Sequence, residues 1–273
     1  MKNFIFIFII LLFASCEKSN DVQFTDTPII ESYLLPGNYL TLIVSHQIPF
    51  SSDAEYSGED INNLSITVKY NDSISHILTP IGDGKYVDSS FVLSEGDYIE
   101  MSFEYNSNNI WAYTYLPLKP NGLTISESSI SIARRDSASG PPSSGSMPDP
   151  ISLTWDNNDD SYYLVVVECM ESTLDPIQDF GDGEAPQSRF RKSPGKFSSE
   201  EIRAMDFNYF GSHRIILYHV LPDYADLYNQ TNNSSLNLTN PSTSIKYGYG
   251  IFTGLNSDTV YIEVLESSKK SKM

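Results

Sequence analysis

The stretch Ile151–Glu168, ISLTWDNNDDSYYLVVVE, consists of two strand-like runs separated by an acidic turn. The first run ends on Trp155, which we expect to fill the core between two sheets, because large aromatic side chains dominate such interiors. The second run continues to Cys169, which on a strand shares a face with Val165 and Val167. Free cysteine is among the most buried residue types, so we predict an inert, buried thiol here. The stretch therefore indicates a protein built from packed β-sheets.

The composition of the whole chain also favours sheets. Its 273 residues include 18 Tyr and 14 Phe, and aromatic residues favour strands. Gly and Pro, 15 of each, suit a chain with many turns. The length is sufficient for two domains of ordinary size. A formal net charge of −18 repels nucleic-acid phosphates, so we expect no nucleic-acid partner.

Outward from this stretch toward the N-terminus, short strand-like runs follow one another. Tyr39–Ile48 alternates, with Leu40, Leu42 and Val44 on one face, and Gly82-Asp83-Gly84 is a hairpin-turn signal. About seven strands spaced roughly 8–12 residues apart, without a long helix, are typical of a β-sandwich. We predict an immunoglobulin-like sandwich over residues 28–120 and a linker rich in Ser, Pro and Gly over residues 121–150.

The second half is predicted to be another β domain, over residues 151–266, followed by a disordered basic tail, residues 267–273. Its opening, a strand with Trp155, an acidic turn and a Tyr-rich strand, resembles that of fibronectin type III domains. We expect a loop over Asp179–Pro194, and short helices at Ser199–Met205, after a capping box, and at Asp223–Gln230, after Pro222. The remaining predicted strands are His213–Leu221, Ser244–Thr253 and Thr259–Glu266. The expected fold class is thus all-β, with two tandem β-sandwich domains, immunoglobulin-like and then fibronectin type III-like.

Residues 1–15 have the pattern of a secretory signal peptide. Lys2 precedes the apolar run Phe4–Phe13, which is shorter than the ~20 residues a membrane span needs. The ending Phe13-Ala14-Ser15-Cys16 resembles the bacterial lipobox, which implies cleavage before Cys16 and acylation of its thiol, with palmitate among the chains. Residues 16–27 would then be a polar tether. The alternative is an ordinary cleaved signal beside an incidental cysteine. Lipidation of Cys16 leaves Cys169 without a disulfide partner.

Four motifs carry a wider resemblance: PIIESYLLPG (Pro28–Gly37), DGKY (Asp83–Tyr86), GDYIEMSF (Gly96–Phe103) and YGYGIFTG (Tyr247–Gly254). In this order, after a lipobox, the chain resembles a group of Bacteroidetes outer-membrane lipoproteins catalogued as a domain of unknown function and often encoded beside TonB-dependent receptors. The resemblance implies a lipid-anchored outer-membrane protein, facing either the cell surface or the periplasm, with a TonB-dependent receptor as a possible partner. It supplies no catalytic residues.

Metal and catalytic motifs are not evident. His213 and His219 would lie on one strand face but ~20 Å apart, too far to share a metal ion. Two acidic clusters, Asp156–Asp160 and Asp179–Glu184, could bind calcium or simply form turns. The sequence contains no common nucleophile or phosphate-binding motif. We therefore predict no enzymatic activity, no cofactor and no metal site.

Three tyrosines, Tyr162, Tyr209 and Tyr247, are the candidate ligand-facing aromatics, able to stack on sugar rings. Core packing is the alternative, since alternate residues of a strand face opposite ways. Asp136-Ser137-Ala138 resembles the O-glycosylation motif of secreted Bacteroidetes proteins, which makes Ser137 a candidate modification site. A three-residue motif also arises often by chance.

Three functions are compatible with these observations. The first is a non-catalytic accessory or binding partner of a TonB-dependent receptor, which captures an unknown small molecule or glycan. The second is a structural or adhesive protein of the cell surface. A glycan hydrolase is the third, since a pair of carboxylates ~5–9 Å apart cannot be recognised in a sequence.

Overall fold

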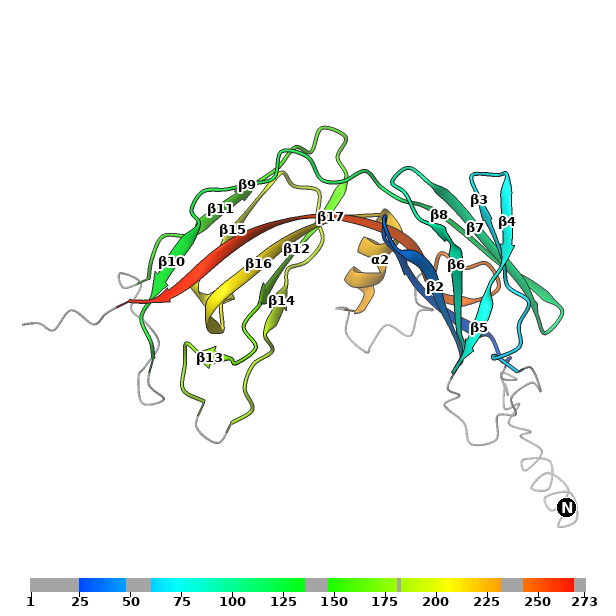
Figure 1. Cartoon of the computed structure of the whole chain (residues 1–273), viewed down its shortest axis with the longest axis horizontal. Coiled ribbons are helices and arrows are strands. Elements are labelled where there is room, and N and C mark those ends of the chain that lie inside the picture. The colour runs from blue at the N-terminus through cyan, green and yellow to red at the C-terminus, as the bar shows by residue number, and fades with distance from the viewer. Residues whose placement is uncertain (1–24, 48–59, 136–146, 181–182, 232–242, 268–273) are drawn as a thin grey trace, which may run out of the picture.

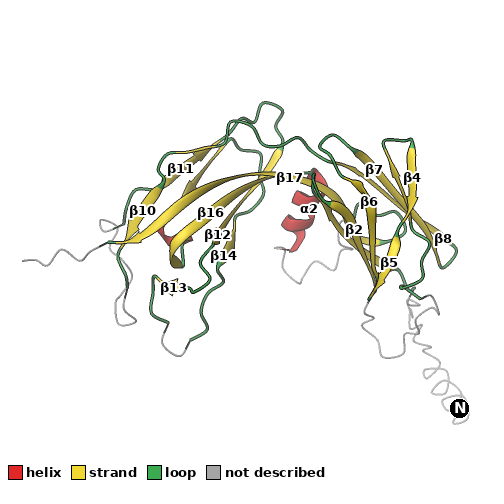
Figure 2. Cartoon of the chain, in the orientation of Figure 1, coloured by secondary structure: helices red, strands yellow, loops and turns green. Residues whose placement is uncertain are grey.

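The structure is a computed structural model that describes residues 25–47, 60–135, 147–180, 183–231 and 243–267. In these ranges the chain is all-β and sandwich-like, with strands in several sheets and a single α-helix (Figure 1). Figure 2 shows how strands dominate both ends of the arch that the chain forms. The predicted fold class is confirmed at this level.

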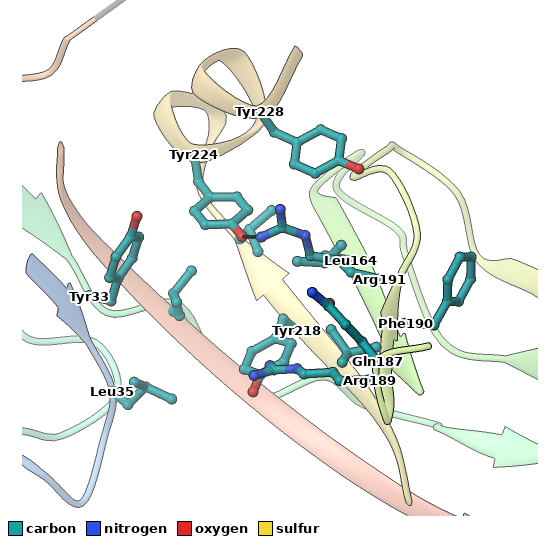
Figure 3. Close-up of a pocket in the computed structure, with 13 residues that line it drawn as sticks. Tyr33, Leu35, Leu164, Gln187, Arg189, Phe190, Arg191, Tyr218, Tyr224 and Tyr228 are labelled. Atoms are coloured by element: carbon teal, nitrogen blue, oxygen red, sulfur yellow. Dashed lines mark hydrogen bonds between the residues drawn. The ribbon is translucent and has the colours of Figure 1, made fainter. Parts of the chain in front are cut away.

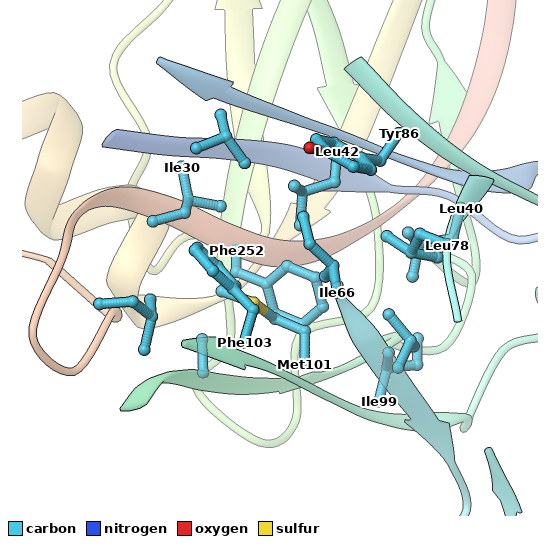
Figure 4. Close-up of a cluster of buried hydrophobic side chains, with 14 of the residues drawn as sticks. Ile30, Leu40, Leu42, Ile66, Leu78, Tyr86, Ile99, Met101, Phe103 and Phe252 are labelled. Atoms are coloured by element: carbon cyan, nitrogen blue, oxygen red, sulfur yellow. The ribbon is translucent and has the colours of Figure 1, made fainter. Parts of the chain in front are cut away.

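The first group of strands packs two sheets face to face around one core. One sheet has the order β1-β2-β6-β5 and the other the order β4-β3-β7-β8. Their bounds are β1 Pro28–Leu34, β2 Tyr39–His46, β3 Thr67–Tyr70, β4 Ile74–Ile77, β5 Thr79–Gly82, β6 Lys85–Val92, β7 Tyr98–Tyr105 and β8 Asn108–Tyr115. As the alternation predicts, Leu40, Leu42 and Val44 are buried. Figure 4 shows the apolar side chains of both sheets meeting between them.

The second group repeats this plan with different strands. The sheet β14-β12-β16-β17, with β10 and β13 on its margins, faces the short sheet β15-β11-β9. The bounds are β9 Thr124–Ile125, β10 Ser129–Ile132, β11 Ile151–Thr154, β12 Tyr162–Cys169, β13 Asp175–Pro176, β14 Arg189–Arg191, β15 Ser199–Ile202, β16 Tyr209–Val220 and β17 Tyr249–Glu266. Trp155 is 4% exposed in the core between these sheets, which confirms its predicted place.

Of the two predicted helices, one is confirmed and one is wrong. Helix α2, Pro222–Thr231, starts at the proline itself, whose fixed φ suits a first helical position. The predicted helix Ser199–Met205 is instead strand β15 followed by a single 3-10 turn, Ala204–Asp206. Hydrogen bonding of β15 to β11 and burial of Ile202 outweigh the local capping signal.

Strand β17 differs most from its prediction. The two strands expected at Ser244–Thr253 and Thr259–Glu266 are one strand of 18 residues. Its first part, Tyr249–Gly254, pairs in parallel with β1, and its second part, Leu255–Val264, pairs antiparallel with β16. It therefore runs through both strand groups and joins them into one ten-stranded sheet (Figure 1). The boundaries 28–120 and 151–266 stay a prediction.

The first core depends on side chains from the C-terminal part of the chain. Ile245 and Phe252, 4% and 0% exposed, belong to the same apolar cluster as Ile30 and Phe103. Figure 4 shows the ring of Phe252 among the residues of both sheets. The first sandwich is thus completed by residues that follow β16, a strand of the second sandwich, in the sequence.

A buried carboxylate ties three strands of the first sandwich together. Asp88 on β6 is 5% exposed and accepts hydrogen bonds from Tyr70 Oη at 2.9 Å and from His76 Nδ1 at 2.6 Å. The backbone N–H of Ser90 donates to it as well, at 2.9 Å. Burial alone would raise the pKa of Asp88, but hydrogen bonds from Ser90, His76 and Tyr70 lower it from 3.8 to about 2. The carboxylate is therefore held in its charged form.

We expect Phe252→Ala to lower the free energy of unfolding by about 3–5 kcal/mol, the usual cost of removing a buried aromatic ring. Tyr261→Ala is the matched control, because Tyr261 lies on the same strand but is 67% exposed. Urea unfolding followed by circular dichroism measures both. Equal losses in the two variants would contradict the role of Phe252 in the first core.

Asp88→Asn should change how the free energy of unfolding depends on pH. Because the folded-state pKa lies below the unfolded value, the charged carboxylate stabilises the fold above about pH 4, and this contribution disappears between about pH 4 and pH 2. Over that interval the wild-type protein should lose about 2 kcal/mol more than the variant. Chemical unfolding at several pH values tests this expectation, and parallel pH curves for the two proteins would refute it.

Candidate ligand-binding pocket

The three tyrosines predicted to face a ligand do not form one site. Tyr209 is 2% exposed and its hydroxyl donates to the carbonyl of Pro186, so its expected ligand-facing role is wrong. Tyr162 is half-buried, pairs with Val220 at the far end of β16 from Tyr209, and has the Lys196 ammonium 5.0 Å above its ring. Strand geometry separates the two tyrosines by almost the length of β16.

Tyr247 is the most exposed of the three, at 58%, and precedes β17. Its φ of 60° is in the left-handed region, and the Lys246 ammonium lies 5.2 Å from the centre of its ring. The neighbouring Lys246 is bridged to Trp111 of β8, in the first sandwich. Tyr247 is therefore accessible but remote from the other two tyrosines.

Several sequence predictions lie outside the described residues. These are the signal peptide, Cys16, Ser137, Asp182 and most of the basic tail. The end of the predicted tether is described, and it is held firmly: Asp26 is 6% exposed and accepts a hydrogen bond of 2.7 Å from Tyr105 Oη. The chain is thus fixed to the first sandwich just before β1.

The larger sheet of the second sandwich is buried on both faces. Val165 and Val167 of β12 point into the main core, whereas Leu164 and Val166 point away from it. The outward pair forms a third apolar cluster with Ile216, Val220 and Leu255. This second face is the one toward which α2 lies (Figure 1).

A cavity of about 680 Å³ lies over this second face. Leu164, Val166 and Leu255 contribute apolar side chains, and Figure 3 shows tyrosines and arginines converging on the same space. The polar and aromatic lining comes from the end of β1, from β14 and its preceding loop, from β16 and from α2: Tyr33, Gln187, Arg189, Phe190, Arg191, Tyr218, Tyr224 and Tyr228. The cavity therefore lies where the two strand groups meet.

Arg191 is held in place by two tyrosines of α2. Its Nη1 donates to Tyr224 Oη at 3.2 Å, and its guanidinium carbon lies 4.9 Å from the centre of the Tyr228 ring. Tyr224 in turn meets Tyr33 edge to face, with ring centres 6.1 Å apart. Burial raises the pKa of Tyr33, and the charges of Glu31 and Tyr224 raise it further, although Arg191 opposes them. The Tyr33 phenol therefore stays neutral at ordinary pH.

Arg189 lies two residues from Arg191 on β14, so both side chains leave the same side of the strand. The ring of Phe190, between them in the chain, points away from the two guanidinium groups (Figure 3). Neither arginine forms a salt bridge with any described residue, and no hydrogen bond within these ranges involves the Arg189 guanidinium. Among the described residues, the lining contains two arginines and no carboxylate, imidazole or thiol, so its formal charge is positive.

The two histidines of β16 have structural partners in the described part of the chain. His213 is 2% exposed, and its Nδ1 donates to the carbonyl of Gly211 at 2.9 Å. His219 stacks on Tyr163 at 5.0 Å and donates to the carbonyl of Leu118. Across the described ranges no three His, Cys, Asp or Glu residues gather closely enough to hold a metal ion.

The pocket residues of β14 and its preceding loop were missed because Asp179–Pro194 is predicted to be a loop. In the structure Arg189–Arg191 forms β14 and pairs with β12. One signal was present: the run Leu164–Val167 is apolar without alternation, which is typical of a strand buried on both faces. That run indicates a second covered face of the sheet, although it does not reveal the residues that cover it.

Comparison with known proteins gives little further information. No family model matches the chain, and no curated protein matches it. Among solved structures, a two-domain fibronectin type III segment of chicken tenascin is similar over 72% of this chain and 92% of that chain, at 11% sequence identity and a TM-score of 0.23. Agreement this loose supports no argument about function. In the described ranges, no helix has the length and apolarity that crossing a membrane requires.

The thiol of Cys169 should be unreactive in the folded protein. It is 8% exposed, and burial raises its pKa, so little thiolate forms. In a Cys16→Ser chain, where Cys169 is the remaining cysteine, we expect reaction with a disulfide reagent at least ~100-fold slower than in denaturant. Absorbance of the released thiolate measures the rate. Similar rates with and without denaturant would show that the thiol is accessible.

Proposed function

We propose that this protein is a non-catalytic, lipid-anchored component of the outer membrane that binds a ligand for a TonB-dependent receptor during nutrient capture. Three lines support the proposal. They are the lipobox-like ending at Cys16, the resemblance to outer-membrane lipoproteins, and the pocket beside α2.

The pocket is the observation that carries the binding role. Its volume of about 680 Å³ is within the ~300–1,000 Å³ usual for small-molecule sites. Apolar side chains form part of its lining, and a few polar groups converge on it, as in most ligand sites. Because these groups include no nucleophile and no acid–base pair, a binding role suits the lining better than catalysis.

The anchor supports the proposed location. Each acyl methylene buried in a membrane contributes ~0.8 kcal/mol, and more than one chain gives durable attachment. Asp26 fixes the chain to the body shortly after the lipidated position. The body would therefore stay close to the membrane that contains the receptor.

In the native host, we expect the wild-type protein to incorporate labelled palmitate and to co-purify with a TonB-dependent receptor from detergent-solubilised membranes. Cys16→Ser should abolish labelling and release the protein from the membrane fraction. Cys169→Ser is the matched control and should behave as wild type, because Cys169 is buried in the fold.

Two results would count against this function. Absence of palmitate from the wild-type protein would remove the anchor, and consistent absence of a receptor from the purified complex would remove the partner. If a deletion strain grows normally but loses attachment to surfaces, the structural or adhesive alternative is favoured instead.

A further inference from the structure

We propose that the pocket beside α2 selects an anion carried on a ring-shaped body: a carboxylate, sulfate or phosphate group held by Arg189 and Arg191, with the ring against the tyrosines. This inference rests on the proposed binding function and names the ligand class of the same pocket.

The charge of the pocket is opposite to that of the protein. The chain has a formal net charge of −18, yet the part of the lining that the structure describes has two arginines and no carboxylate. Cations of an acidic protein usually pair with its abundant carboxylates, but neither arginine forms a salt bridge with a described residue. A guanidinium offers five N–H donors, and the known hydrogen bond of Arg191 uses one of them. The unused donors match the oxygens of a carboxylate, sulfate or phosphate.

Arg191 is already positioned before a ligand arrives. Its hydrogen bond to Tyr224 and its place over the Tyr228 ring restrict its rotamers. A restricted side chain loses less conformational entropy on binding, which increases affinity. Arg189 has no such restraint in the described structure and can adapt to the second edge of the anion.

The rest of the pocket suits a ring. Four tyrosines contribute to the lining, and Tyr33 and Tyr224 are already arranged edge to face. Leu164, Val166 and Leu255 add apolar surface beside them. Aromatic faces and aliphatic side chains can cover the flat apolar part of a ligand and exclude water from it. The arginines can then bind the charged group of the same ligand. A neutral ring would gain the apolar contacts but not the interaction with the arginines.

Two fluorescent probes distinguish the apolar contacts of the pocket from its recognition of an anion. Anilinonaphthalenesulfonate and N-phenylnaphthylamine have the same ring system, but only the first carries an anion. Titration of the purified Cys16→Ser chain should give saturable binding of both probes. A higher salt concentration should lower the affinity for the anionic probe and leave the affinity for the neutral probe unchanged, because salt screens charge interactions.

Arg189→Gln is the decisive variant, since the Arg189 guanidinium forms no hydrogen bond or salt bridge with the described residues. It should lower the affinity for the anionic probe at least about tenfold, which is the contribution expected of a charge-assisted hydrogen bond. The affinity for the neutral probe should change less than about twofold. Arg203→Gln is the matched control: it removes the same charge from an exposed position outside the pocket, and both affinities should stay at the wild-type value. Thermal melting of each variant verifies that it is folded.

Competition against the anionic probe identifies the kind of ring. Displacement by a galacturonate oligomer assigns an acidic sugar, and displacement by naphthoate alone assigns an aromatic acid; either supports the proposal.

If Arg189→Gln and Arg203→Gln lower the affinity for the anionic probe equally, anion selection is refuted, while binding of the neutral probe still supports a ligand-binding role. If neither probe binds the wild-type protein, the pocket assignment itself is overturned, and palmitate labelling and receptor co-purification still test the anchor and partner independently.

Discussion

The backbone pairing of β17 is the interaction on which the rest of the structure depends. One strand hydrogen-bonds to β1 along its first part and to β16 along its second. Both sandwiches therefore contain part of the same rigid element, and Phe252 fills the first core from within it. A change in this strand acts on both ends of the molecule.

Close backbone approach makes glycine necessary at two positions of this strand. A Cβ at Gly250, whose φ is +99°, would lie 1.9 Å from the carbonyl oxygen of Ile30. A Cβ at Gly254 would lie 2.0 Å from the carbonyl oxygen of Tyr115. These contacts leave no space for a side chain, because real Cβ atoms do not approach an oxygen so closely. The motif YGYGIFTG thus has a packing explanation that is independent of any resemblance.

Local patterns predicted much of the fold but little of the site. The alternation in β2, the turn at Asp83 and the place of Trp155 depend on neighbouring residues, so they could be read from the sequence. The helix expected at Ser199–Met205 failed because pairing with β11, a distant strand, overrides a cap signal. The pocket joins β1, β14, β16 and α2, and no pattern within a short window reveals which distant segments meet. For the same reason Tyr209, at the start of an aromatic pair, could not be distinguished as a core residue.

The pairing of Ile30 with Gly250 also constrains the order of assembly. A chain that is made, or threaded through a membrane, from its N-terminus exposes β1 long before its partner strand emerges. Until then the free edge of β1 and the apolar side chains that await Phe252 are open to other polypeptides, a condition that promotes aggregation. Contacts between segments so far apart in a chain also form slowly. The first sandwich can therefore close only after the last strand of the chain has arrived.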